Sequence, residues 1–472
     1  MPFARHARPQ TLASLADAAP IPFWLDDSDR PTPTSALTGA TTADLAIVGA
    51  GFTGLWAALL AKQATPARDV VLIEGDETAT GATGRNGGFV SASLTHGFEN
   101  GRERWPNELA TLTALGNANL DAIGATVAEL GIDCDFLRSG AITVATEPYQ
   151  VARMRGQPAL AAPYGEKLEW LERDLVRALV DSPTYLGALF APESMAMANP
   201  ARLAWGLRQA CLDIGVRLYE RTPVTALEAR RAAVVVKTPY GRVRAARVAL
   251  ATNAYPPLLR RMSHYVVPVY DYVLVTEPLS AAQWAAIGWR GRQGLGDSGN
   301  QFHYYRTTAD GRILWGGYDA IYHWNNGFGP HLDRDPDSFG RLAEHFFQTF
   351  PQLEGLRFTH ACGGAIDTCS RFSPFWGLAH GGRTAYVLGY TGLGVGASRF
   401  GALVMLDLLD GRRSERTRLE MARTKPVPFP PEPFRSLAIN LTRWSLDQAD
   451  RNQGRRNLWL RTIDWLGLGY DS

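Results

Sequence analysis

The stretch DLAIVGAGFTGLWAALLA, residues 44–61, decides the fold because two different apolar patterns meet in it at a cluster of glycines. Its first part is an apolar run of strand length, and its second part has apolar residues at helical spacing. The segment DVVLIEGD, residues 69–76, is a second apolar strand that ends in an acid. A strand, a helix and a strand in this order predict a βαβ unit in a parallel sheet, and hence an α/β fold.

The glycines of GAGFTG follow the G-x-G-x-x-G pattern with Gly49, Gly51 and Gly54. The first glycine permits a tight turn, the second lets the backbone approach a pyrophosphate, and the third allows close packing of helix on strand. Glu74 lies 25 residues after Gly49, at the end of the second strand, where a carboxylate accepts hydrogen bonds from a ribose hydroxyl. Strand, helix and acid together predict a dinucleotide site.

A second glycine-rich loop, ETATGATGRNGGFVSASLTHG at residues 77–97, follows directly after the acid. A domain that binds only NAD has no need of this loop. Arg85 and Asn86 lie between its glycines, and such a loop can bring backbone N–H groups against a planar ring system and its phosphates. The alternative interpretation is a flexible surface loop. We favour FAD as the bound dinucleotide.

The composition excludes several other classes of protein. The chain has 472 residues and a net charge of +2, so its charge gives no indication of nucleic-acid binding. Four cysteines without an export signal are typical of a reducing compartment, and we expect a cytoplasmic protein. No apolar window reaches the length of about 18 residues that a membrane span requires. Only four of the 48 basic residues are lysines, which leaves few lysines for chemistry.

Further segments indicate a second domain. Alternating patterns such as YDYVLVTEP (270–278) and RILWGGYDAIYHW (312–324) are typical of a largely antiparallel sheet. Pieces of this domain alternate along the chain with pieces of the nucleotide-binding domain. The predicted division is an N-terminal arm (1–43), an FAD-binding domain (44–100, 196–264 and 350–425), a substrate domain (101–195 and 265–349), and a C-terminal strap with an amphipathic helix (426–472).

With these motifs, the chain resembles the D-amino-acid-oxidase-like family of FAD-dependent oxidoreductases over about Pro22 to Ser472. Besides the βαβ start, the resemblance rests on GATGRNGG (81–88), PVTALE (223–228), VALATNAY (248–255) and GYTGLGVGASRFGA (389–402). The GRNGG form and the N-terminal arm resemble the γ-glutamylputrescine-oxidase-like branch most. The implied fold is an FAD-binding Rossmann-like domain with an antiparallel substrate domain, the glutathione-reductase-2-like arrangement.

The resemblance implies a set of FAD-binding residues. Gly49, Gly51, Gly54 and Glu74 would bind the ADP half, and Val224 would meet the adenine through its backbone. The remaining members are Arg85, Asn86 and Gly88 along the pyrophosphate and isoalloxazine, Thr252 and Asn253 at a strand end, and Gly392, Leu393 and Gly394 at the ribityl and pyrimidine end.

The family pattern also bears on the substrate. Amino-acid oxidases of the family carry a segment G-L-R-P-x-T-x-D-x-x-P whose arginine binds the substrate α-carboxylate. Matching its final proline to Pro374 puts Ile366 at the arginine position, within CGGAIDTCSR (362–371). A carboxylate needs a guanidinium for bidentate binding, and isoleucine cannot provide it. This favours an amine without that carboxylate, and Asp367 is a candidate partner for its nitrogen; the alternative is a loop-capping aspartate.

The remaining site candidates are drawn from aromatic and polar positions. The catalytic candidates are Asp367, His96 and Tyr318, and the substrate-binding candidates are His303, Tyr304, Trp315, Arg371 and Tyr390. Cys362 and Cys369 with His360 do not make up a metal set, and we predict no metal. The two thiols are expected to pack beside the flavin. The resemblance leaves covalent attachment of the flavin through Cys362 as an alternative to the non-covalent FAD that we expect.

The predicted function is oxidation of an amine to an imine and then an aldehyde, with FAD taking the hydride and O2 reoxidising the flavin to give H2O2. Leu314 stands where sarcosine oxidases have a lysine over the flavin, so a dehydrogenase with a quinone or protein acceptor is the alternative. A flavin-binding protein without turnover is a third hypothesis. The C-terminal RRNLWLRTIDWLGLGYDS (455–472) is expected to pack on the protein, with peripheral membrane association as the alternative. The oligomeric state is not predicted.

Overall fold

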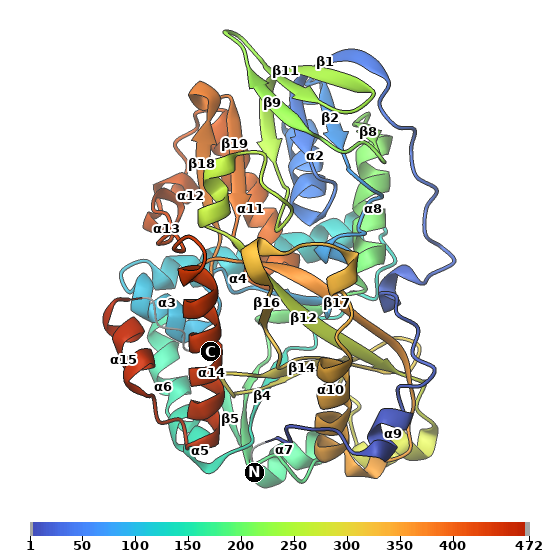
Figure 1. Cartoon of the computed structure of the whole chain (residues 1–472), viewed down its shortest axis with the longest axis vertical. Coiled ribbons are helices and arrows are strands. Elements are labelled where there is room, and N and C mark those ends of the chain that lie inside the picture. Colours follow the sequence, from blue (N-terminus) through green and yellow to red (C-terminus); the bar gives the residue numbers. More distant parts are fainter. Residues whose placement is uncertain (1–2, 468–472) are drawn as a thin grey trace.

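The computed structural model describes residues 3–467 and divides its strands between two large sheets (Figure 1). The eight-stranded sheet contains the predicted βαβ unit: β1 (Gly39–Val48), α2 (Phe52–Ala64) and β2 (Val70–Ile73). The path through it runs β18-β19-β11-β1-β2-β8, and β1 is parallel to both β2 and β11. Its other strands are β8 (Arg217–Tyr219), β9 (Ala226–Ala229), β10 (Val234–Lys237), β11 (Gly241–Leu250), β18 (Phe375–Ala379) and β19 (Thr384–Leu388).

The central strands of this sheet end in apolar residues that are covered on both faces, Leu45–Val48 in β1 and Val248–Leu250 in β11. Leu45 and Ile47 of β1 pack in the core that also contains α2, whereas Ala46 and Val48 pack in a separate core on the other face. A strand that is buried on both faces has a continuous run of apolar residues, as Leu45–Val48 have. The helices α4 (Leu109–Glu129), α8 (Pro200–Asp213) and α11 (Gly394–Leu409) complete the first of these cores.

The nine-stranded sheet is antiparallel except where β13 runs parallel to β4, in agreement with the predicted substrate domain. Its longest ladder joins β12 (Val267–Thr276) to β17 (Phe358–Thr368). The helix α10 (Pro336–Thr349) packs on β12. The other strands are β4 (Ala141–Ala145), β5 (Glu169–Glu172), β6 (Gly187–Ala191), β13 (Gly294–Asp297), β14 (His303–Thr307), β15 (Ile313–Gly317) and β16 (Ile321–Tyr322).

The sheets place three borders differently from the predicted division. The arm ends earlier, because β1 begins at Gly39. The strand β17, which we expected in the FAD-binding domain, pairs with β12 in the substrate sheet. The helix α4, expected in the substrate domain, packs its apolar side in the FAD-domain core. These borders depend on long-range contacts, which local patterns do not contain.

The chain ends in a helical hairpin, α14 (Phe434–Arg451) and α15 (Leu458–Trp465), drawn in red in Figure 1. We expected one amphipathic helix in this region; residues 468–472 lie outside the described part. Asp450 fixes the hairpin to the substrate domain, since its carboxylate accepts hydrogen bonds from the backbone N–H of Asn300 and Gln301, both at 3.0 Å. No helix among residues 3–467 is long and apolar enough to span a membrane.

Asp450→Ala should loosen the hairpin without unfolding the sheets. The substitution removes the acceptor of four hydrogen bonds, from the Asn300 N–H and side chain, the Gln301 N–H and the Tyr149 hydroxyl, and each buried donor left unsatisfied costs about 1–3 kcal/mol. We expect faster amide hydrogen exchange in 434–467 and unchanged exchange in β1 and β2. Asp464→Ala is the control, because its ion pair with Arg456 is worth only about 0–1 kcal/mol. Equal exchange in both variants would contradict the anchoring role.

Candidate active site

One cavity of about 1310 Å³ connects the ends of β1 and β2 with the face of β12 and β17. Its lining includes Gly49 and Glu74 at one end and Val269 and Ile366 at the other. Ligand pockets commonly have volumes of about 300–1,000 Å³. The cavity therefore has room for a large ligand together with a smaller one.

The glycines at the start of α2 are required by backbone contacts. Gly49 has φ +100°, and a Cβ atom there would lie 2.5 Å from the carbonyl oxygen of Ala251. A Cβ atom at Gly54 would lie 1.8 Å from the carbonyl oxygen of Gly49. Turn and helix are thus packed as the dinucleotide pattern predicts, with Gly54 behind the cavity wall and Gly51 lining it.

Glu74 lies where β2 ends and faces the same turn. Its carboxylate oxygens accept hydrogen bonds from the backbone N–H of Ala50 at 2.6 Å and of Asp76 at 3.0 Å. Burial raises the pKa of this carboxyl. The carboxylate is held rigidly at the cavity, in the position expected for binding ribose hydroxyls.

Two helices begin at the cavity without a capping bond from the residue before them, although the Phe52 N–H of α2 donates to the Thr83 hydroxyl at 3.1 Å. Gly51 precedes α2 and Leu393 precedes α11, and neither supplies a capping hydrogen bond. Uncapped N–H groups at a helix N-terminus attract phosphate and other electron-rich groups. The Ser398 hydroxyl of α11 also lines the cavity and is buried without a hydrogen-bond partner in the described part of the chain. These donors fit the phosphates and the polar ring edge of FAD.

The GRNGG loop connects the two domains. Asn86 holds the loop together: its side-chain N–H groups donate to the carbonyls of Ala82 and Thr83, and its side-chain oxygen accepts from the Gly88 N–H. The Arg85 guanidinium forms an ion pair with Asp333 of the substrate domain. Arg85 and Asn86 line the cavity, whereas Gly88 lies behind it, where a Cβ atom would come within 2.2 Å of the Ala198 carbonyl oxygen.

Backbone strain is concentrated at this cavity. Non-glycine residues rarely adopt the left-handed conformation, and such residues gather at functional sites. Six of those in this chain line the cavity: Ala79, His96, Asn253, Tyr318, Phe372 and Thr391. Asn253, His96 and Tyr318 are among the predicted site residues.

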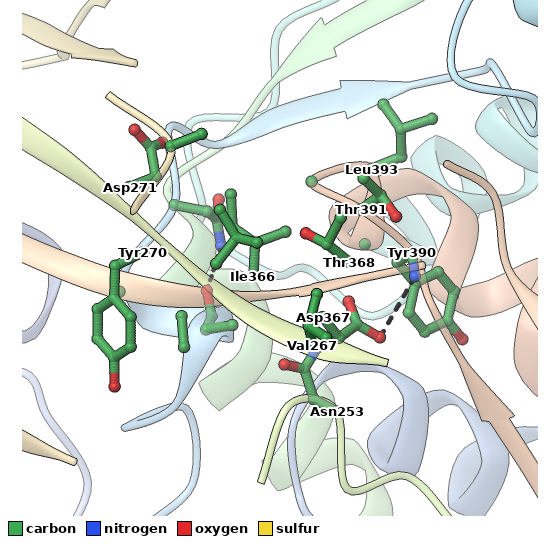
Figure 2. A pocket seen from close by; sticks show the side chains of 18 of the residues that line it. Asn253, Val267, Tyr270, Asp271, Ile366, Asp367, Thr368, Tyr390, Thr391 and Leu393 are labelled. Carbon is green, nitrogen blue, oxygen red and sulfur yellow. Dashed lines mark hydrogen bonds between the residues drawn. The ribbon is translucent and has the colours of Figure 1, made fainter. Parts of the chain in front are cut away.

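Asp367 stands near the end of β17 and is directed at the turn between β19 and α11 (Figure 2). Its carboxylate accepts hydrogen bonds from the N–H of Gly389 at 2.6 Å and of Tyr390 at 3.3 Å. Burial raises the pKa of this carboxyl to about 7. Asp367 lines the cavity, but these contacts match the loop-capping interpretation. A direct role in catalysis stays a prediction.

The cavity brings together most of the other candidates. Thr252, Val224, Gly392 and Gly394 line its flavin side, with Tyr304, Tyr318, His96 and Tyr390 around the rest. The Tyr390 hydroxyl accepts a hydrogen bond from Thr53 at 2.9 Å. Burial lowers the pKa of His96 and raises the pKa of Tyr318 to about 12, so both side chains favour the neutral form.

Three predicted substrate-binding residues do not line the cavity, and their contacts explain why. Arg371 donates to the backbone carbonyls of Ser373, Pro374, Met421 and Thr424, so its guanidinium clamps the C-terminal part of the FAD domain.

His303 is fully buried, with Nδ1 at 2.6 Å from Asp297 and Nε2 at 2.9 Å from His345. Trp315 is also fully buried and packs between His303 and Tyr305. The donors of Arg371 and the ring nitrogens of His303 are occupied by other protein groups, and Trp315 is part of the core.

The cysteines are structural. Cys369 is fully buried and lies 3.2 Å from the Ser373 carbonyl oxygen. Burial raises the pKa of the Cys362 thiol to about 12, and Cys362 is not among the described residues that line the cavity. A neutral thiol away from the cavity argues against covalent attachment of the flavin. No group of three or more His, Cys, Asp or Glu side chains within 3–467 is arranged to hold a metal ion.

Asp271 is a site residue that we did not predict. It lies on β12, lines the cavity, and accepts a hydrogen bond of 2.7 Å from the Tyr304 hydroxyl. Burial raises the pKa of this carboxyl to about 6. The signal is present in YDYVLVTEP, where an acid interrupts the alternating apolar face of a strand.

The C-terminal hairpin also contributes to the cavity wall, which the sequence patterns did not indicate. Its lining residues come from both helices: Ala438, Ile439, Thr442, Arg443, Leu446, Trp459, Thr462, Ile463 and Leu466. Leu314, expected near the flavin, is instead 1% exposed in the core under β15 and is not among the described lining residues.

Comparison with known proteins agrees with this geometry. A sequence profile described as "FAD dependent oxidoreductase" matches residues 44–408. The gamma-glutamylputrescine oxidoreductase of Escherichia coli (strain K12) is 31% identical over 404 residues, which cover 82% of this chain and 88% of that protein. A probable oxidoreductase OrdL of Haemophilus influenzae is 27% identical, with the same coverage of both chains.

Solved structures of similar fold extend the comparison. The crystal structure of glycine oxidase from Geobacillus kaustophilus has a TM-score of 0.68 and 19% identity, and the match covers 82% of this chain and all of that one. L-proline dehydrogenase from P. horikoshii has a TM-score of 0.65 and 17% identity, over 79% of this chain and 95% of that one. At these identities the similarity concerns the fold, and the fold is the one that the sequence predicts.

Gly54→Ala should yield protein without bound FAD. The added methyl group would overlap the Gly49 carbonyl and force the turn away from the pyrophosphate. The measurement is the ratio of flavin to protein absorbance after purification, with circular dichroism to test folding. Gly156→Ala is the matched control, because the nearest atom to its added Cβ lies 4.0 Å away. A flavin content like that of the control would contradict the assignment.

Asp367→Asn should change the pH dependence of stability. The pKa raised from 3.8 to about 7 means that the folded state binds this proton more tightly than the unfolded chain. This contribution to stability is fully present at a pH below 3.8, the pKa of the carboxyl in the unfolded chain. It is lost as the pH rises through about 7, the pKa in the folded protein. An amide stays neutral, so the variant should gain stability relative to the wild type with rising pH, on the order of a few kcal/mol.

The measurement for Asp367→Asn is the melting temperature of both proteins across the range from about pH 5 to pH 8. A difference in melting temperature that does not vary with pH would contradict the prediction.

Proposed function

Because the chain belongs to the family of FAD dependent oxidoreductases, we propose that it oxidises a C–N bond of an amine to an imine, which water hydrolyses to an aldehyde. The bound FAD supplies the hydride acceptor for this reaction. The N-termini of α2 and α11 and the carboxylate of Glu74 hold the cofactor. The substrate lies in the same cavity, against the face of β12 and β17.

The observation that carries the proposal is the continuity of the cavity from the dinucleotide turn to a nearly apolar sheet face. Val269 and Ile366 form a cross-strand pair on that face. An apolar wall excludes water from the reacting carbon and binds the carbon chain of a substrate. Ile366 stands where the family pattern has a carboxylate-binding arginine, which supports an amine rather than an α-amino acid. The relative named gamma-glutamylputrescine oxidoreductase supports the same class.

For the acceptor of the electrons we propose O2, with H2O2 as the product. A dehydrogenase with a quinone or protein acceptor is the second candidate, and the lack of a described lysine in the cavity wall favours it. Sarcosine oxidases resemble this chain but have a lysine over the flavin, whereas Leu314, the residue expected in its place, is buried in the core. The proposed partners are thus a small amine and O2. Four free, buried thiols support the expected cytoplasmic location.

Anaerobic titration of the purified holoenzyme tests the proposal. We expect an amine to bleach the flavin absorbance and air to restore it with formation of H2O2. The panel consists of polyamines, acylated polyamines, N-methyl amines, aminophosphonates and α-amino acids. Protein reduced with dithionite and exposed to air is the control, since it gives the reactivity with O2 without any substrate.

The outcomes separate the candidates. Bleaching by an amine with slow recovery in air supports the dehydrogenase. The absence of bleaching by every amine would contradict both candidates. Rapid turnover of plain α-amino acids would contradict the argument from Ile366.

A further inference from the structure

The face of β12 and β17 that lines the cavity carries one acid among apolar residues. Val267, Val269 and Asp271 lie on one side of β12, since side chains alternate along a strand. Their direct partners on β17 are Thr368, Ile366 and Gly364. All six line the cavity. Asp271 therefore lies on the same face as Ile366. It is two residues further along β12 than Val269, which is the cross-strand partner of Ile366.

Asp271 lines the cavity. Its partner across the ladder is Gly364, over which the Arg85 side chain packs, since a Cβ atom at Gly364 would lie 3.3 Å from the Arg85 Cβ. Tyr304 donates a hydrogen bond of 2.7 Å to one oxygen, and the Tyr272 N–H donates one of 2.8 Å to the other. The Gly317 backbone is a further hydrogen-bond donor to the carboxylate. Within residues 3–467 no basic side chain forms an ion pair with it. Figure 2 shows Asp271 and Asp367 on either side of Ile366.

The other acids on the substrate side of the cavity are already engaged, whereas Glu74 and Asp76 lie at its dinucleotide end. Asp333 pairs with Arg85, and Asp319 pairs with Arg341. Asp367 caps the turn at Gly389. An acid in an apolar wall without a cation of its own attracts one strongly, because a charge-assisted hydrogen bond gains strength where water is excluded.

We propose that Asp271, oriented by Tyr304, binds the cationic nitrogen of the substrate. This inference rests on the proposed function and names its substrate class: aliphatic ammonium compounds without a carboxylate beside the reacting carbon. In amino-acid oxidases, an arginine at the place of Ile366 binds the substrate carboxylate at this face of the sheet. In this chain, Asp271 on the same face binds a cation instead. The Tyr304 ring adds an aromatic surface beside the ammonium group.

The electrostatic neighbours of Asp271 are few. Asp319, beyond the end of β15, raises its pKa slightly but is neutralised by Arg341. On the side of β17 lie the Cys362 thiol and the Arg85–Asp333 pair. The Tyr304 hydroxyl stabilises the ionised form, against the larger effect of burial that raises the pKa to about 6.

The test uses two inert probes of the same shape and opposite charge, tert-butylammonium and pivalate. Neither has a hydrogen on the carbon beside its charged group, so neither is oxidised. Binding is followed by equilibrium dialysis and by the change in absorbance of the bound flavin. We expect the wild-type holoenzyme to bind tert-butylammonium and to bind pivalate much more weakly, with ammonium binding weakening as the pH falls through about 6.

Two variants identify the residue. Asp271→Asn should weaken tert-butylammonium binding by about tenfold to a hundredfold. The affinity of this variant should not depend on pH near the midpoint, which is the pH at which the wild type loses half of its ammonium binding. Tyr304→Phe removes a donor to the carboxylate, so that midpoint should move up by roughly half a unit to one unit. A purely structural role for Tyr304 would not move the midpoint. Ile366→Arg should bind pivalate and lose tert-butylammonium.

The result that overturns the inference is a wild type that prefers pivalate, or an Asp271→Asn variant with unchanged affinity and pH dependence. These failures are distinct from failure of the proposed function. If amines bleach the flavin equally in the wild type and in Asp271→Asn, the inference fails and the function stands. If Asp271 governs ammonium binding but no amine bleaches the flavin, the inference stands and the function fails.

Discussion

The two sheets are coupled by a carboxylate in the hinge region between them. Asp367 leaves the substrate sheet with β17 and binds the backbone of Gly389 and Tyr390, where β19 turns into α11. Without this contact the N-terminus of α11 would have no fixed position relative to the β12–β17 face. Together with the Thr391 N–H, which donates to the Asp367 carbonyl, and the Arg85–Asp333 ion pair, this contact holds the cofactor end and the substrate end of the cavity in place.

The dinucleotide half of the site was predictable because its determinants are local. Gly49, Gly51 and Gly54 lie within six residues, and Glu74 follows at the end of the next strand. All four belong to one βαβ unit, and the closest contact at Gly54 is with the Gly49 carbonyl of the same turn, so the spacing in sequence already indicates the geometry. The second glycine-rich loop is local in the same sense.

The substrate half was not predictable in the same way because it is assembled from distant segments. Asp271 faces the site only through its register with Gly364, 93 residues later in the chain. The Arg371 guanidinium could bind an anionic substrate group, but it donates its hydrogen bonds to protein carbonyls, including that of Thr424. His303 is likewise saturated by Asp297 and His345. Residue type indicates what a side chain can bind, and only the tertiary structure shows what it already binds.

The wide separation of the segments that build the cavity has a consequence for the biosynthesis of the enzyme. The strand β1 pairs with β11 about two hundred residues later, and α11 and the hairpin of α14 and α15 complete the wall. Pairings of such long range form late in folding. The strand β1 therefore lacks one of its two neighbours until β11 has been synthesised. We expect a cofactor bound across these segments to stabilise the folded chain by mass action, so that the folded fraction rises with the supply of FAD.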